Sequence, residues 1–155
     1  MKIWTRNPAA ELLTVFDHVA RTRMAGLPIC NPALQVETVD FRRGGEEHWV
    51  GALLTPWAIE LLCLPGQAEN WPQLAAGDRH EWHFPSGRQQ FVVTEEAALG
   101  VYHVCSLYAP VLDFETQAQA RRAALAGLHA LFVEPPASPL RAMLPRRPLW
   151  SGSCA

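Results

Sequence analysis

The sequence predicts an α+β fold, in which a mostly antiparallel sheet of about five or six strands is covered by an N-terminal and a C-terminal helix. Amphipathic helical spacing near both ends of the chain is the first observation that predicts it. The second is a series of alternating or apolar runs joined by short connections, which favour antiparallel pairing. We expect both helices to lie on one face of the sheet. With 155 residues, 49% of them hydrophobic, the chain can form one domain with a modest core.

The first helix is predicted within "NPAAELLTVFDHVARTRM", residues 7–24. Asn7 is a favoured N-cap residue, and Pro8 suits the first helical position. Gly26 is expected to end the helix. Apolar residues at helical spacing form its core-facing stripe: Leu12, Leu13, Phe16, Val19, Ala20 and Met24.

The next segments alternate as strands do. Residues 35–41 predict a half-exposed strand, with Val36, Thr38 and Asp40 on one face. After the turn "RRGGEE", residues 48–55 are mostly apolar and predict a buried strand. A further short strand is expected at 59–64, in preference to a helix of about two turns.

The second half of the chain predicts a hairpin, a strand and a helix. "RHEWHFPSGRQQFVVTEE" gives two alternating runs around Pro85-Ser86-Gly87, and residues 99–108 give the last strand. Within that strand His103 and Cys105 fall on one face and Ser106 on the other. Asp113 is expected to cap the helix in "FETQAQARRAALAGLHALFV". The predicted core-facing stripe of this helix comprises Phe114, Ala118, Leu125, Leu128 and Phe132.

The composition changes after Glu134. Residues 135–155 hold five prolines, three arginines and no acidic residue. We therefore divide the chain into a folded domain at 1–134 and a Pro/Arg-containing flexible tail at 135–155.

Composition and motifs exclude several classes of function. A net charge of −2 gives no general attraction to nucleic acid, and the apolar runs fall far short of the ~20 residues that span a membrane. The N-terminus lacks an export signal, so we expect a cytoplasmic protein. Phosphate-binding glycine loops, HExxH and GxSxG are missing. We predict no catalytic residue, no metal and no cofactor.

Cys30, in "GLPICNPAL", is the residue that most resembles a catalytic or metal-binding cysteine. The four cysteines form no close pair, and no histidine has a local signature that links it to Cys30 as a base. An alternative is metal or iron–sulfur handling by Cys30 with Cys105 and His103, which share a strand face. The interpretation we prefer is a rigid turn, because two prolines fix the backbone around Cys30 and the side chain of Asn31 can hold a turn. Prolines beside aromatic residues recur in other loops, as in Pro56-Trp57 and Trp71-Pro72, and such residues are typical of protein-binding surfaces.

Several of these loops carry a family resemblance. "LPICNPALQVETVDF", "WVGALLTPWAIELLCLPG", "WP", "FPSG…F" and "VCSLYAP" occur in this order and resemble the HybE family of [NiFe]-hydrogenase assembly chaperones. The likeness runs from about Leu12 to Phe132, so that 1–134 is expected to be a HybE-like chaperone domain. The resemblance implies a non-enzymatic cytoplasmic protein that binds a hydrogenase small-subunit precursor with its twin-arginine signal, or the large subunit, before export. A rubredoxin-like or other maturation protein would be a separate partner, because the chain has no CxxC pair.

We expect the partner-binding surface to lie at these loops. Its candidate residues are Pro28, Cys30, Asn31, Pro32, Thr55, Pro56, Trp57, Trp71 and Pro72, with Cys105 and Ser106 as neighbours.

Overall fold

The computed structural model describes residues 1–135 of the chain. The predicted tail, apart from Pro135, lies outside the described residues, so its separation from the domain at 1–134 stays a prediction. The elements in chain order are α1 (Ala9–Arg21), β1 (Glu37–Arg43), β2 (His48–Leu54), β3 (Ile59–Pro65), β4 (Arg79–Phe84), β5 (Gly87–Glu96), β6 (Gly100–Tyr108) and α2 (Gln117–Ala130).

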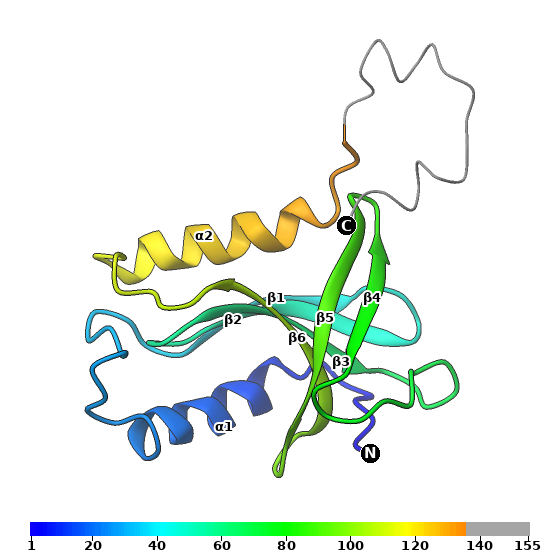
Figure 1. Ribbon diagram of the computed structural model, residues 1–155, viewed down its shortest axis with the longest axis horizontal. Coiled ribbons are helices and arrows are strands. Elements are labelled where there is room, and N and C mark those ends of the chain that lie inside the picture. The colour runs from blue at the N-terminus through cyan, green and yellow to red at the C-terminus, as the bar shows by residue number, and fades with distance from the viewer. Residues whose placement is uncertain (136–155) are drawn as a thin grey trace.

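The six strands form one antiparallel sheet in the order β1-β2-β3-β6-β5-β4. The predicted fold class, the hairpin around Pro85-Ser86-Gly87 and the strand that begins at Ile59 are confirmed. The helices lie on opposite faces of the sheet, α1 on one side and α2 on the other (Figure 1). The expectation that both helices cover one face was therefore wrong.

The two central strands explain why the sheet has a helix on each face. Nearly every residue of β2 and β3 is buried, so both faces of these strands need cover. Leu61 and Cys63 belong to the core on the α2 side, whereas Leu62 and Leu64 belong to the core on the α1 side. Such continuous apolar runs are typical of strands buried on both faces. One amphipathic helix on each face covers the apolar side chains of these strands.

A bulge in β1 changes the predicted alternation. Pairing with β2 shifts between Val39 and Arg42, and Asp40 has φ = 50°, in the left-handed region. As a result Val39 packs on the α2 side and Phe41 on the α1 side, although strict alternation places them on one face. The Phe41 ring lies against Gly51 of β2, where any side chain would collide with it.

The first helix is shorter than predicted. α1 begins at Ala9, and Pro8 rather than Asn7 is the N-cap residue. The Asn7 side chain still accepts a hydrogen bond from the Ala9 amide (2.9 Å) and donates one to the Phe41 carbonyl (3.0 Å). α1 ends at Arg21, and the chain continues in turns to Gly26, whose φ of 73° suits a residue without a side chain.

The second helix begins at Gln117, with Thr116 as its N-cap rather than the predicted Asp113. The Thr116 hydroxyl accepts from the Gln119 amide while the Gln119 side chain accepts from the Thr116 amide, which completes a capping box. Arg121 of α2 forms a two-pronged ion pair with Glu37 of β1 (2.6 and 2.9 Å). The bonds from Arg121 hold the pKa of Glu37 below its ordinary value.

Candidate protein-binding surface

Asn31 joins three loops at one end of the sheet. Its side-chain amide donates to the carbonyls of Val111 (3.0 Å) and Phe114 (2.7 Å), and its side-chain oxygen accepts from the Ala33 amide (2.9 Å). Its backbone amide donates to the Pro56 carbonyl (2.8 Å). The residue is only 5% exposed. Asn31 was predicted to contact a partner, but its buried side chain instead fixes the loops that carry the exposed residues.

The turn between β2 and β3 is held by Thr55. Its hydroxyl donates to the Ala58 carbonyl (2.9 Å) and lies 3.0 Å from the Ala58 amide and 3.4 Å from the Trp57 amide. Thr55 is completely buried, whereas Pro56 and Trp57 at the tip of the turn are half-buried. Like Asn31, Thr55 positions its neighbours and does not itself line the surface.

Large apolar side chains are exposed on the loops that Asn31 joins. Leu27 and Ile29 follow α1, while Tyr108 (45% exposed) is the last residue of β6 and Leu112 (50%) follows that strand. Figure 1 shows that the loop between α1 and β1 and the loop between β6 and α2 lie at the same end of the molecule. We call Pro28, Ile29, Trp57, Tyr108 and Leu112 the loop surface. Exposed apolar residues gathered on fixed loops are typical of protein-binding sites.

Cys30 lies at the base of the loop surface. It is half-buried, and its thiol donates to the Met24 carbonyl with Sγ and O 3.3 Å apart. Among residues 1–135, no three His, Cys, Asp or Glu side chains are arranged to hold a metal ion, so Cys30 does not join Cys105 and His103. Burial raises the pKa of Cys105, whose Sγ lies 3.3 Å from the Gln89 side-chain nitrogen. Neither arrangement favours the metal-handling alternative.

Trp71 lies in a cluster that the sequence did not reveal. Its ring is 3% exposed and packs against His103, with ring centres 4.4 Å apart, and against Trp82 at 5.4 Å. His48 and His80 pack on Trp82 at 4.4 and 4.8 Å. We call these five residues the histidine–tryptophan cluster. Trp71 was predicted to line the surface; it is instead a core residue, and only the neighbouring Pro72 is partly exposed.

The histidines of this cluster are held neutral. The Trp82 indole donates to Nδ1 of His103 (2.9 Å), so in the neutral ring the proton is on Nε2. Burial and the neighbouring His80 and His48 lower the pKa of His103 to about 4. Burial also lowers the pKa values of His48 and His80. Only His80 and Trp82, two residues apart on β4, carry a local signal, because alternation places them on one face.

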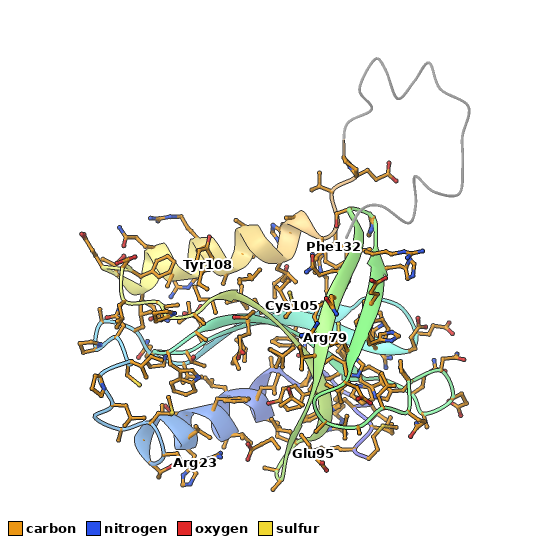
Figure 2. The ribbon with its side chains drawn as sticks, viewed as in Figure 1. Arg23, Arg79, Glu95, Cys105, Tyr108 and Phe132 are labelled. Atoms are coloured by element: carbon orange, nitrogen blue, oxygen red, sulfur yellow. The ribbon has the colours of Figure 1, made fainter. Side chains whose placement is uncertain are left out.

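The remaining candidate residues have side chains that a partner can reach. Pro28, Pro32 and Ser106 are exposed, and Cys30, Pro56, Trp57 and Cys105 are partly exposed. Figure 2 shows Cys105 in the middle of the sheet and Tyr108 beside the N-terminal half of α2. The structure thus brings residues 28–32, 56–57 and 108–112 toward one end, with Cys105 nearer the middle of the sheet. Trp71 belongs to the histidine–tryptophan cluster, and Pro72 follows it in the chain.

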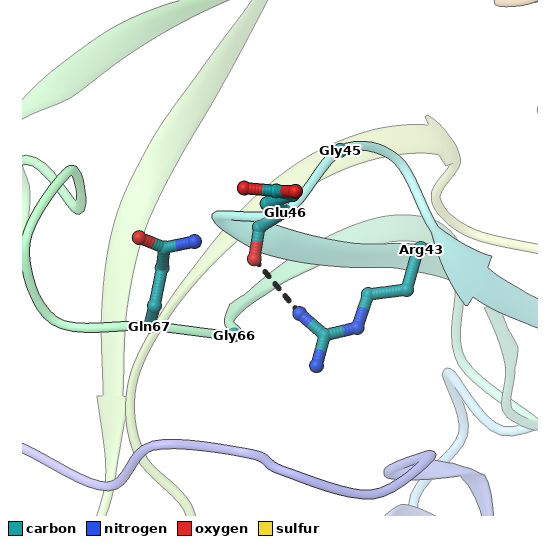
Figure 3. A pocket seen from close by; sticks show the side chains of 5 residues that line it. All are labelled: Arg43, Gly45, Glu46, Gly66 and Gln67. Atoms are coloured by element: carbon teal, nitrogen blue, oxygen red, sulfur yellow. Dashed lines mark hydrogen bonds between the residues drawn. The ribbon is translucent and has the colours of Figure 1, made fainter.

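An open pocket of about 590 Å³ lies away from the loop surface, where the β1–β2 turn meets the end of β3. Figure 3 shows its lining residues, Arg43, Gly45, Glu46, Gly66 and Gln67. The Arg43 guanidinium already donates to the Glu46 carbonyl (2.8 Å) and lies over the Trp49 ring (4.6 Å). This cation is therefore engaged within the protein.

The fold and the loop surface together define a small α+β protein whose exposed chemistry is suited to binding another chain. No helix within residues 1–135 combines the length and the apolar character needed to cross a bilayer. The solution structure of HybE from Escherichia coli shares the fold, with a TM-score of 0.67 over 95% of this chain and 94% of that one, at 24% sequence identity.

Residues 7–152 match the family model described as "[NiFe]-hydrogenase assembly, chaperone, HybE", and the chain belongs to this family of assembly chaperones. It is 36% identical over 140 residues to the hydrogenase expression/formation protein HupT of Azotobacter chroococcum, covering 90% of this chain and 92% of the relative. It is also 36% identical over 123 residues to the probable rubredoxin HupJ of Rhodobacter capsulatus. That match covers 79% of this chain but only 44% of the longer relative.

Proposed function

We propose that this chaperone binds a [NiFe]-hydrogenase subunit precursor through the loop surface and acts by binding rather than by catalysis. The observation that carries the proposal is the set of exposed apolar side chains on loops fixed by the buried Asn31. Because these loops are already ordered by hydrogen bonds, binding costs little conformational entropy. Membership in the assembly-chaperone family supports a protein client.

The client in this proposal is the small-subunit precursor with its twin-arginine signal, or the large subunit, held in the cytoplasm before export. A separate rubredoxin-like protein is a further candidate partner, supported by the relative named as a probable rubredoxin. Moderate affinity suits the task, because the client must be released. Pro28, Pro32, Trp57 and Leu112 are the residues we expect it to touch.

Two matched substitutions test the proposal. Leu112→Ala and Leu13→Ala remove the same side chain from exposed positions, one on the loop surface and the other on α1. We expect Leu112→Ala to weaken the complex with an unprocessed hydrogenase subunit, and Trp57→Ala to weaken it by about tenfold or more, as expected for an aromatic anchor. Leu13→Ala should leave binding unchanged.

Binding is measured by calorimetry with each purified precursor, and folding of each variant is checked by circular dichroism. Failure of the wild-type chain to bind either precursor would exclude the proposal. If the Trp57 and Leu112 variants bind as tightly as the wild-type chain, the contact does not lie on the loop surface.

A further inference from the structure

Strand β6 is paired on both sides only at His103 and Val104. β5 pairs with it from Glu96–Gly100 to Val92–Val104, whereas β3 follows it through to the Ile59–Tyr108 pair. From Cys105 to Tyr108, one edge of β6 therefore has no neighbouring strand among residues 1–135. The first half of β5 pairs instead with β4, and the two strands diverge from β6 (Figure 1). An open strand edge is a template on which an extended chain can add.

Glu60 of β3 lies across β6 from this open edge. It is the cross-strand partner of Ser106, and partners in register share a face of the sheet. That face is the α1 side, because the flanking Leu61 belongs to the core on the α2 side. Burial raises the pKa of Glu60, and no other group within the described residues offsets this effect. Glu60 is thus a largely desolvated carboxyl group without an internal cation.

The nearest candidates for a partner are already used or have the wrong charge. Arg23 forms its ion pair with Glu96 at 3.3 Å. Tyr102 and Cys105 both have pKa values raised in part by Glu60, which shows that these uncharged groups lie close to it. Glu60 is half-buried, and a carboxylate that is partly removed from water without a paired charge carries a desolvation cost that a cation from outside would offset.

We propose that an extended segment of the partner adds as a strand to β6 at Cys105–Tyr108 and places an arginine or lysine side chain on Glu60. Neighbouring strands lie about 4.8 Å apart, so a long side chain on the added strand must pass over β6 to reach β3. Ser106 is small and exposed, which leaves this route open. Tyr108 at the end of the open edge belongs to the loop surface, so one bound segment contacts both the open edge of β6 and the loop surface.

The carboxylate selects among possible occupants of the edge. The phosphates of a nucleic acid would be repelled by Glu60, and a second copy of this edge would bring another carboxylate and no cation. A basic, extended protein segment supplies both the backbone partners and the missing charge. This inference rests on the proposed function, since its occupant is part of the client subunit.

The test compares Glu60→Gln with the matched control Glu95→Gln. Glu95 is exposed at the far end of β5, where the strands are fully paired (Figure 2). With the unprocessed hydrogenase subunit that the wild-type chain binds, we expect Glu60→Gln to weaken binding about tenfold or more and to reduce its salt dependence. Glu95→Gln should bind within about twofold of wild type.

Hydrogen exchange on the wild-type chain provides a second measurement that needs no substitution. The amides of Cys105–Tyr108 that face the open edge should exchange more slowly in the complex, while the amides that pair with β3 are already protected in the free chain. Unchanged exchange at 105–108, or binding by Glu60→Gln as tight as that of the wild-type chain, would overturn the inference. In either case the effect of Trp57→Ala on binding would still test the proposed function. Protection of these edge-facing amides in the free chain would place the occupant within this chain and would equally overturn the inference. Absence of any wild-type binding would instead remove the proposed function.

Discussion

The loop end and the histidine–tryptophan cluster both bury polar side chains, but they satisfy them differently. At the loop end, Asn31 uses its side-chain nitrogen and oxygen on three backbone groups. In the cluster, both nitrogens of His48 and Nε2 of His103 have no hydrogen-bond partner within residues 1–135. Asn31 does not titrate, whereas each histidine does. Asn31 therefore fixes its loops independently of pH, while the histidine–tryptophan cluster is stable only as long as its imidazole rings are neutral.

Replacing Asn31 should have the largest effect on the free energy of unfolding. Asn31→Ala leaves the carbonyls of Val111 and Phe114 and the amide of Ala33 without their partner. A buried unsatisfied group costs about 1–3 kcal/mol, and only the bond to Val111 is fully buried while the other two are partly buried, so we expect the free energy of unfolding to fall by roughly 3–5 kcal/mol. Urea denaturation followed by tryptophan fluorescence measures it.

The exposed Asn70 provides the matched control, since Asn70→Ala removes the same side chain from a surface loop. It should change the free energy of unfolding by less than about 0.5 kcal/mol. Similar losses in the two variants would mean that Asn31 does not hold the three loops together.

Lowering the pH should destabilise the histidine–tryptophan cluster. The folded-state pKa of His103, about 4, lies below the ordinary value of 6.5, so the unfolded chain binds more protons between these values. Stability is therefore complete above pH 6.5 and is lost as the pH falls toward 4, by about 3 kcal/mol in total at 1.4 kcal/mol per pKa unit. His48 and His80 act in the same direction. Glu60, with its raised pKa, acts in the opposite direction near pH 4.5.

Urea denaturation at a series of pH values from 7.5 to 4 measures this loss. His103→Asn keeps an acceptor for the Trp82 indole but does not titrate, so the slope between pH 6.5 and 4.5 should decrease. A wild-type stability that is constant over this range would contradict neutral burial of the histidines.

Replacing Cys30 should have the smallest effect. A serine hydroxyl can donate to the Met24 carbonyl as the thiol does, so Cys30→Ser should change the free energy of unfolding by less than about 0.5 kcal/mol. Precursor binding should also be unchanged. Stoichiometric nickel or iron in anaerobically purified wild-type protein, lost in Cys30→Ser, would restore the metal-handling alternative.

The elements that the sequence predicts well are those with local signals. The strand at Ile59–Pro65 and the β4–β5 hairpin follow from apolar alternation and turn residues that are adjacent in the chain. The Asp40 bulge could not be predicted, because it depends on how β1 pairs with β2. Thr116 was missed in favour of Asp113, although the Thr116–Gln119 spacing is itself a capping-box signal.

The sequence indicated which loops lie together but not which of their residues are buried. "GLPICNPAL" and "TPW" do lie together, as their Pro-rich turns suggested, because Asn31 bonds to both Pro56 and the 111–114 loop. Whether Asn31, Thr55 or Trp71 is buried depends on contacts with residues up to 83 positions away. No local pattern contains that information. The open edge of β6 was equally hidden, since it results from the divergence of β5.

The double burial of β2 and β3 also has a thermodynamic consequence. The two cores on either side of the sheet share these strands, with consecutive residues such as Leu61 and Leu62 belonging to opposite cores. Neither core can lose its packing without disturbing the backbone that orders the other. We therefore expect the two layers to melt in a single cooperative transition rather than one after the other.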